Sequence, residues 1–277
     1  MYDSILVPTD GSDVAAAAAD AAVALARRFG ADVHALYVRD SDDDDDRGER
    51  ATTAVADRAA AADVTATTAV VDAEGPVHRR ILDYGDEHDV DCIVMGTHGR
   101  TGLDRFVLGS VAERTLRESL VPVLTVHEET VVDRDLDAIL VPTDGSAGAA
   151  AAAAHAVDLA VATGATLHVV HVVDVGVLPI DGSGAVLDEL QRVGRQALDS
   201  VVERAEEAGV STIRASVLSG TPYRAISDYA DAEAIDLVAM GTHGRTGFDR
   251  YLLGSVTERV VRLCDRPVLT LGNGEDR

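Results

Sequence analysis

The amino-acid sequence predicts an α/β protein made of two tandem domains, each a doubly wound parallel sheet of five strands. Short apolar segments alternate with longer helical segments, which is typical of βαβ units and a parallel sheet. The segment Ile5–Ser12 also recurs unchanged as Ile139–Ser146, and Met95–Gly102 recurs unchanged as Met240–Gly247. Two repeats of this length indicate two copies of one domain rather than a solenoid.

The first repeat opens with an apolar strand at Ser4–Val7 and a Pro-Thr-Asp-Gly-Ser turn. Ser12 or Asp13 can cap the Ala-rich helix that follows, and Gly30 ends it after Phe29. The later elements are expected as strand Val33–Val38, helix Glu49–Ala62, strand Thr65–Val71, helix Val77–Glu87, strand Asp91–Met95, helix Ser110–Ser119 and strand Pro122–Val126. The aspartates of 42–46 are expected to form a solvated loop, and they lack the spacing of an EF-hand.

The second repeat follows the same order with a longer central part. Its elements are expected as strand Ala138–Val141, helix Ser146–Thr163, strand Thr166–Val172, helix Leu187–Ala208 and strand Pro267–Leu271. The pattern places domains at 1–127 and 138–272, joined by a charged linker at 128–137 and followed by a frayed tail at 273–277.

A glycine-rich loop follows the fourth strand of each repeat, with the spacing G-x2-G-x9-G-S. In the first copy the glycines are Gly96, Gly99 and Gly109. Ser110 and Glu113 have capping-box spacing, which predicts a helix starting there. A helix N-terminus attracts anions, and glycines permit positive φ and a close approach of backbone to a ligand. The spacing is neither a Walker loop nor G-x-G-x-x-G, so it predicts a phosphate cradle of another kind.

Both repeated motifs are expected in one crevice. Ligands of open α/β sheets bind at the carboxyl ends of the strands, where the winding direction reverses. The turn at Thr9-Asp10 and the loop from Gly96 to Gly109 face one another there if the first and fourth strands are neighbours.

Composition restricts the class of partner. The chain has 34 Asp, 14 Glu, 24 Arg and no Lys, for a net charge of −24, which resembles proteins of extreme halophiles. Such a surface disfavours nucleic acid. The two cysteines form no disulfide or metal pattern. No basic leader or uncharged apolar run of membrane-spanning length occurs, so we expect a cytoplasmic protein without a membrane partner.

Two copies of a Pro-Thr-Asp turn after the first strand, each followed by G-x2-G-x9-G-S, resemble a tandem universal stress protein. The resemblance covers nearly the whole chain. It implies Rossmann-like sheets of strand order 3-2-1-4-5, similar to adenine nucleotide alpha hydrolases, and ATP as the ligand, with or without Mg²⁺.

The resemblance also implies two sets of nucleotide-binding residues. Asp10 and Thr9 belong to the nucleoside side, Val38 and Met95 lie against the adenine, and the glycine loop wraps the ribose and phosphates. The first set is Pro8, Thr9, Asp10, Val38, Met95, Gly96, Gly99, Gly109, Ser110 and Val111. The second set is Pro142, Thr143, Asp144, Val172, Met240, Gly241, Gly244, Gly254, Ser255 and Val256.

Other readings of these motifs stay open. The Thr-Asp-Gly-Ser segment could be only a turn with an N-cap. His98 and His243 lie in the glycine loops without a nearby nucleophile and suit hydrogen-bonding roles, and we likewise interpret His168 and His171 as structural. Four arginines near the loops suit either phosphate contacts or exposed salt bridges: Arg100, Arg105, Arg245 and Arg250.

Three functions follow from these readings. The first is a nucleotide-binding stress-response module that changes conformation or partner with ATP. The second is a slow ATPase or phosphotransferase, which the missing lysine and missing general base disfavour. The third is a nucleotide-free scaffold, which the intact glycines disfavour. We expect the two domains to pair through the final strands, with a homodimer left open.

The two repeats differ after their second and third strands. Repeat two has Val175–Ile180, which could cover a bound base, where repeat one has the aspartate run, so the second site is expected to bind more tightly. Repeat two also reads Gly220-Thr-Pro where repeat one reads Gly75-Pro-Val.

Overall fold

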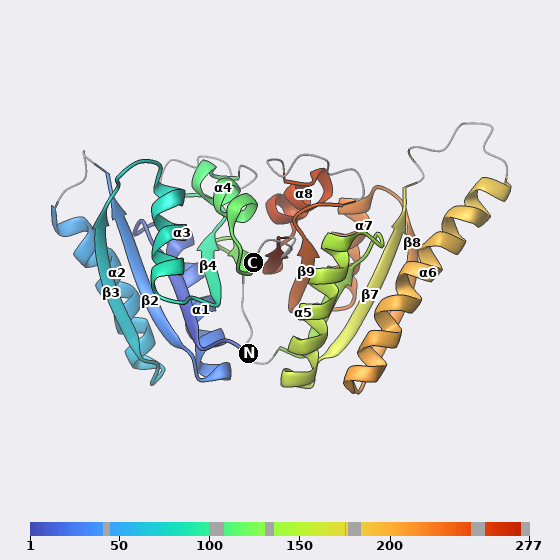
Figure 1. Ribbon diagram of the computed structural model, residues 1–277, viewed down its shortest axis with the longest axis horizontal. Helices are drawn as coiled ribbons and strands as arrows, with labels where there is room; N and C mark the ends of the chain where they lie inside the picture. Colours follow the sequence, from blue (N-terminus) through green and yellow to red (C-terminus); the bar gives the residue numbers. More distant parts are fainter. Residues whose placement is uncertain are drawn as a thin grey trace. The chain divides into compact units, whose positions relative to one another are not determined.

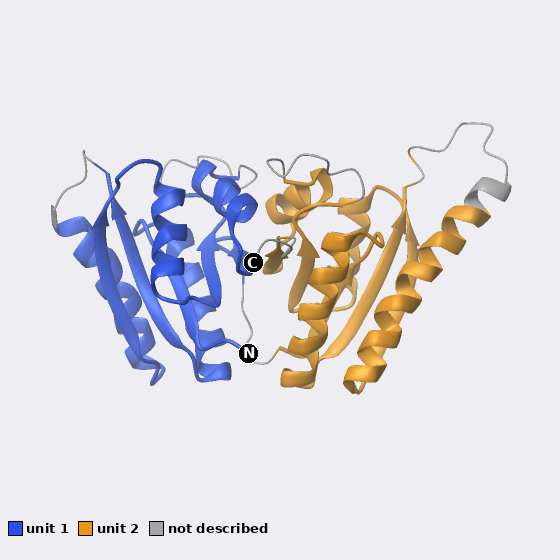
Figure 2. Cartoon of the chain, in the orientation of Figure 1, with its two compact units in different colours: residues 1–134 blue, residues 135–277 orange. Residues whose placement is uncertain are grey.

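The computed structural model describes residues 1–40, 45–99, 108–130, 136–174, 176, 184–244 and 253–272. The chain divides into two compact units, residues 1–134 and 135–277 (Figure 2). None of the helices in these described ranges is both long enough and apolar enough to cross a lipid bilayer.

The first unit is a five-stranded parallel sheet in the order β3-β2-β1-β4-β5 (Figure 1). Its elements are β1 Ser4–Pro8, α1 Asp13–Phe29, β2 Asp32–Arg39, α2 Asp45–Ala61, β3 Ala66–Asp72, α3 Val77–Glu87, β4 Cys92–Gly96, α4 Ser110–Glu118 and β5 Val123–Val126.

The second unit repeats this arrangement, with parallel strands in the order β8-β7-β6-β9-β10. Its elements are β6 Ala138–Pro142, α5 Ala147–Thr163, β7 Thr166–Val173, α6 Gly184–Ala208, β8 Ile213–Ser219, α7 Pro222–Ala232, β9 Leu237–Gly241, α8 Ser255–Leu263 and β10 Val268–Leu271. The predicted α/β class and strand order are therefore confirmed in both units.

Winding in both directions from the first strand puts helices on both faces of each sheet. In the first unit α1 packs beside α2, and α3 packs beside α4 (Figure 1). In the second unit α5 packs beside α6, and α7 beside α8. The central strands are buried on both sides, with Ile5, Leu6 and Val7 of β1 showing no exposure. The reversal of winding lies between the first and fourth strands, where the repeated motifs end.

The predicted ends of α1 are confirmed. The Ser12 hydroxyl oxygen accepts a hydrogen bond from the Ala15 N–H at 3.2 Å, and Gly30 ends the helix with φ 72°. The alanines of α1, including Ala18, Ala19 and Ala22, are buried. Their small side chains let the helix approach the sheet closely, which places the Thr9–Ser12 turn against the end of β4.

Some boundaries differ from the prediction. Helix α2 begins at Asp45 rather than Glu49, so Asp45 and Asp46 belong to its first turn and not to a loop. The carboxylate of Asp46 is favoured there by the partial positive charge of a helix N-terminus. Helix α6 begins at Gly184, before the predicted Leu187. Residues 42–44, and nearly all of 175–180, lie outside the described residues, so the proposed cover of the second site stays a prediction.

The differing exits of the third strands prove equivalent. Gly75 and Gly220 both have positive φ, 126° and 140°, where a side chain would be strained. Two residues after each glycine a helix begins, α3 at Val77 and α7 at Pro222. Proline suits the first helical position, so its presence in one repeat only does not change the turn.

Candidate functional site

The carboxyl ends of β1, β2 and β4 surround a pocket of about 270 Å³ in the first unit. Strand β1 pairs with both β2 and β4, so the loops that leave these strands meet at one edge. All the residues predicted for the first site line this pocket, namely Pro8, Thr9, Asp10, Val38, Met95, Gly96, Gly99, Gly109, Ser110 and Val111. The structure therefore brings together residues from four separate segments of the sequence.

The turn after β1 forms one wall. The Thr9 N–H donates to the carbonyl of Leu36 at 2.8 Å and so ties the turn to β2. The Ser12 N–H donates to Oδ1 of Asp10 at 3.0 Å, and the Gly11 N–H donates to the Thr9 hydroxyl oxygen at 3.2 Å. Asp10 thus shapes the turn, and its side chain also lines the pocket.

The signature glycines provide space rather than an unusual backbone conformation. The positive φ that glycine permits is not used at Gly96, Gly99 or Gly109, because none of them has a left-handed backbone. A Cβ atom on Gly99 would lie 2.5 Å from Oδ2 of Asp10, and one on Gly109 would lie 3.2 Å from Cα of His98. These positions leave no room for a side chain, because the glycine loop packs directly against the turn after β1 and against its own backbone.

Helix α4 opens at the pocket, but not through a capping box. Gly109 is the N-cap, with an extended backbone at φ −67° and ψ 145°, and makes no side-chain cap. Its N–H donates to the Thr97 carbonyl at 2.8 Å, and its own carbonyl accepts from the Glu113 N–H at 2.9 Å. The helix therefore starts one residue earlier than a Ser110 cap requires. Ser110 is the first helical residue, is exposed, and lines the pocket.

The rest of the pocket wall was missed by the sequence-based prediction. The additional lining residues are Ala15, Leu36, Tyr37, Asp40, Val77, Ile81, His98 and Ala112. Two signals could have found some of them. Leu36, Val38 and Asp40 are spaced by two, as on one side of a strand, and Val77 and Ile81 are spaced by four, as on one face of a helix.

The second unit holds its predicted residues in the same local framework. The Thr143 N–H donates to the Val170 carbonyl at 2.8 Å, and the Ser146 N–H donates to Oδ1 of Asp144 at 2.9 Å. A Cβ atom on Gly244 would lie 2.7 Å from Oδ2 of Asp144. The other members lie at the equivalent strand and helix ends, namely Pro142, Val172, Met240, Gly241, Gly254, Ser255 and Val256.

The histidines of both units have hydrogen-bonding roles. Nδ1 of His98 lies 3.2 Å from the Thr97 hydroxyl oxygen, and Nδ1 of His243 lies 3.0 Å from that of Thr242. Nδ1 of His171 lies 2.8 Å from the Thr143 carbonyl and so supports the second turn. His168 meets the Tyr229 hydroxyl at 3.0 Å. The loop arginines Arg100, Arg105, Arg245 and Arg250 lie outside the described residues.

The arrangement combines three kinds of surface. The first N–H groups of α4 have no partner within their helix and carry partial positive charge, which suits an anion. Leu36, Val38 and Ile81 provide an apolar wall, and Asp10 provides a carboxylate. Among the described residues no group of three or more His, Cys, Asp or Glu side chains is placed to hold a metal ion. The pocket suits a small molecule with an apolar ring at one end and an anionic group at the other.

Comparison with known proteins gives the family. The model of the universal stress protein family matches residues 1–127 and again 136–271. A universal stress protein of Methanocaldococcus jannaschii is 42% identical over 137 residues, which cover 48% of this chain and 80% of that protein. One of Mycolicibacterium smegmatis is 31% identical over 199 residues, 70% of this chain and 65% of that protein.

A solved structure extends the similarity to the full length. A universal stress protein from Archaeoglobus fulgidus matches with a TM-score of 0.74 and 25% identity, covering 99% of this chain and 98% of the other. The family model matches both repeats, and both repeats have the same turn, glycine loop and strand order. This chain belongs to the universal stress protein family.

Proposed function

We propose that each unit binds an adenine nucleotide, with ATP as the preferred ligand, and that the protein acts as a nucleotide-responsive module in a stress response. The observation that carries the proposal is the first pocket, where an apolar wall and the N-terminal turn of a helix face the same space. The second unit has the same turn and loop, so the proposal extends to it.

The described residues fit the parts of ATP. In this proposal Val38 and Met95 contact the adenine, and Thr9 and Asp10 accept hydrogen bonds from the nucleoside. The backbone N–H groups of Ser110 and Val111 hold the phosphates at the start of α4. A Mg²⁺ ion, if bound, would be held mainly by phosphate oxygens and water, because Mg²⁺ keeps several waters and uses few protein ligands.

The slow-enzyme alternative is weaker on chemical grounds. Phosphoryl transfer needs charge neutralisation and a positioned nucleophile or base. The chain has no lysine at all, and Nδ1 of His98 faces the Thr97 hydroxyl. We therefore expect ATP to bind with a dissociation constant near about 10⁻⁶ M. Turnover should stay well below about 1 s⁻¹.

The binding experiment replaces one backbone donor without disturbing the helix. Ser110→Pro removes the first N–H of α4, and proline is well tolerated at that position. The extended backbone of Gly109, at ψ 145°, suits a residue that precedes proline. Titration calorimetry with ATP, ADP and AMP should show loss of about 10- to 100-fold in ATP affinity at one site.

Ser255→Pro is the matched change in the second unit, and Ser110→Ala is the control that keeps the N–H. The double proline variant should bind ATP about 10- to 100-fold more weakly at both sites, while its thermal unfolding stays unchanged. Unaltered ATP binding in a folded double variant would refute the proposed cradle. Rapid phosphate release by the wild-type protein that disappears in the double variant would instead establish an enzyme.

We also propose that β5 of the first unit pairs with β10 of the second, with a homodimer as the alternative. Each is the last strand of its five-stranded order and is apolar, and an uncovered edge of this kind favours association. Hydrogen exchange tests the pairing, since the N–H groups of β5 that do not face β4 should then be protected. Fast exchange of those groups in a monomeric protein would exclude it.

A further inference from the structure

An exposed arginine stands at the same position in both units, five residues after the last signature glycine. In the first unit it is Arg114 of α4, and in the second it is Arg259 of α8. Among the contacts between described residues, neither arginine forms an ion pair with a carboxylate. Acidic residues outnumber basic ones by 48 to 24, so an arginine without a carboxylate partner runs against the composition of the chain.

The carboxylates on the same helices are paired with other arginines. Arg117 lies 3.8 Å from Glu113 and 3.7 Å from Glu118 on α4. On α8, Nη1 of Arg262 lies 3.2 Å from Oε1 of Glu258. The same arrangement therefore holds in both units, and it leaves the first arginine of each helix without a carboxylate.

The unpaired arginine lies one helical turn below the proposed phosphate cradle. Ser110 and Arg114 are four residues apart and both exposed, so they share one face of α4. Four residues correspond to about 6 Å along the axis of a helix. Helical side chains lean toward the N-terminus of their helix, so a side chain as long as arginine extends toward that first turn. Ser255 and Arg259 repeat this spacing on α8.

The neighbouring helix shows where the guanidinium group lies. Cζ of Arg259 is 5.2 Å from the ring centroid of Tyr223, the second residue of α7. In the first unit the second residue of α3 is His78. Burial lowers the pKa of His78, and the positive charge of Arg114 lowers it further. Val77, the residue before His78, lines the proposed nucleotide pocket, so Arg114 acts on the first turn of α3 beside the pocket.

This place is electrostatically suited to an anion. The N-termini of α3 and α4 both carry partial positive charge, and a further cation is unfavourable beside them. The first turn of α3 has no side-chain cap, because its N-cap residue is Pro76. In the second unit the ring of Tyr223 partly compensates the charge of Arg259. An anion between the two helix N-termini would compensate it in both units.

The size of the pocket also leaves part of a polyphosphate outside it. Its volume of about 270 Å³ is below the range of about 300–1,000 Å³ that is usual for ligand pockets. The residues of α4 that line it are Ser110, Val111 and Ala112, all in the first turn. A chain of phosphates that starts at this turn therefore continues past the enclosed space.

We propose that Arg114 and Arg259 determine specificity for the number of phosphates, by contacting the terminal phosphate of the nucleotide in the first and second unit. This inference rests on the proposed function and assigns one part of its ligand. A guanidinium group binds phosphate through paired charge-assisted hydrogen bonds. The single phosphate of AMP is held at the helix N-terminus alone, whereas the last phosphate of ATP reaches the arginine.

The test compares ATP with AMP by titration calorimetry, in the wild type and in the variant Arg114→Gln/Arg259→Gln at one KCl concentration. The affinity for ATP should fall about tenfold or more at both sites, while the affinity for AMP stays unchanged. Arg80→Gln/Arg192→Gln is the control. It removes the same charge from arginines that pair with Glu87 and Glu189 on their own helices, and it should bind ATP as the wild type does.

The possible failures are distinguishable. ATP binding that is unchanged in the Arg114→Gln/Arg259→Gln variant would overturn the role of the arginines and leave the proposed nucleotide site intact. Equal weakening of ATP and AMP, or equal weakening of ATP in the control variant, would assign the effect to overall charge and would also overturn it. A wild-type protein that binds neither ATP nor AMP would overturn the proposed function together with this assignment.

Discussion

The signature glycines of the two units make room for different neighbours. A Cβ atom on Gly96 would lie 2.5 Å from Cγ1 of Val14, a side-chain atom of α1. A Cβ atom on Gly241 would lie 2.6 Å from the carbonyl carbon and oxygen of Gly148, which are backbone atoms of α5. Helix α1 therefore approaches β4 through a contact between Val14 and Gly96. The equivalent helix α5 approaches β9 through a contact between Gly148 and Gly241.

This difference gives a prediction for relief of overpacking. Gly96→Ala should destabilise the protein by about 1–3 kcal/mol, because Val14 is buried and cannot move away freely. Adding Val14→Ala should recover part of that loss, since the second change removes the clashing methyl group. Urea unfolding of the single and double variants measures the coupling, expected at about 0.5–3 kcal/mol.

Gly241→Ala supplies the comparison. Its clash is with backbone, so no side-chain truncation in α5 can relieve it. If the destabilising effects of Gly96→Ala and Val14→Ala were strictly additive, a clash with Val14 would not be the reason why residue 96 must be glycine.

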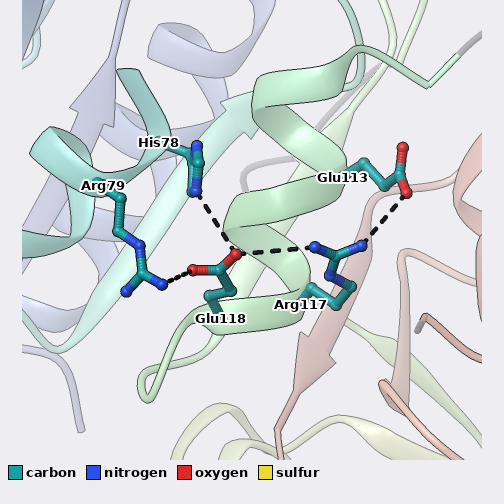
Figure 3. Close-up of polar contacts among 5 residues, drawn as sticks. All are labelled: His78, Arg79, Glu113, Arg117 and Glu118. Carbon is teal, nitrogen blue, oxygen red and sulfur yellow. Dashed lines mark ion pairs between the residues drawn. The ribbon is translucent and has the colours of Figure 1, made fainter. Parts of the chain in front are cut away.

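At the scale of elements, the helices α3 and α4 that flank the first pocket are joined by an ionic cluster (Figure 3). Glu118 of α4 lies 3.5 Å from Nε2 of His78 and 3.0 Å from Nη2 of Arg79, both on α3. Arg117 lies 3.7 Å from Glu118 and 3.8 Å from Glu113. In the second unit Tyr223 and Arg259 form a cation–π contact between α7 and α8 instead, at 5.2 Å.

The contact between His78 and Glu118 should depend on pH, because His78 can take up a proton. Burial lowers the pKa of His78 below its usual 6.5, and Arg114, Arg79 and Arg117 lower it further, while Glu118 raises it. The folded state therefore binds this proton less readily than the unfolded state. The stability that neutral His78 contributes is present above about pH 6.5 and is lost as the pH falls through its lowered folded pKa.

We predict that His78→Tyr, which copies the second unit, loses less stability than the wild type between about pH 7.5 and about pH 5. Urea unfolding at several pH values measures the difference. Other histidines also have a lowered pKa, such as His34 and His168. They contribute equally to the pH dependence of stability in both proteins, so their contributions cancel in the comparison. Parallel pH profiles for the two proteins would rule out His78 as a titrating contributor.

At the scale of the whole molecule, charge is the dominant property. The chain carries 48 acidic and 24 basic residues, so its surface repels itself at neutral pH. Many described ion pairs are exposed, such as Arg192 with Glu189 at 53% and 58% exposure, and pairs of this kind contribute little stability. The net repulsion is therefore only weakly offset by local pairing.

We predict that the protein is more stable in concentrated salt. Thermal unfolding in about 0.1 M and about 3 M KCl should show a clearly higher midpoint in the latter, because the Debye length falls to about 3 Å near 1 M. Sucrose at matched osmolality is the control, since it favours compact states without screening charge. A midpoint that responds to sucrose and KCl alike would mean that repulsion between the acidic side chains does not limit stability.

The sequence by itself determined the two repeats, the parallel α/β class and the set of residues that meet at the first pocket. Strands, helices and turns could be predicted because their signals, apolar periodicity and turn residues, lie within short segments. The pocket residues could be predicted because Thr9 and Gly96 each end a parallel strand, and the carboxyl ends of parallel strands meet at one edge of the sheet. Helix α1 was predictable for the same reason, from Ser12 and Gly30.

Only the tertiary structure decided how those positions are used. Ser110 is the first helical residue rather than a cap because Gly109 bonds to Thr97 across the loop. Val77 and Ile81 join the pocket wall because α3 returns to the sheet edge. Arg58 of α2 meets Asp20 of α1 only because these two helices pack side by side. Each of these outcomes depends on contacts between distant segments, and the spacing of residues along one segment carries no information about them.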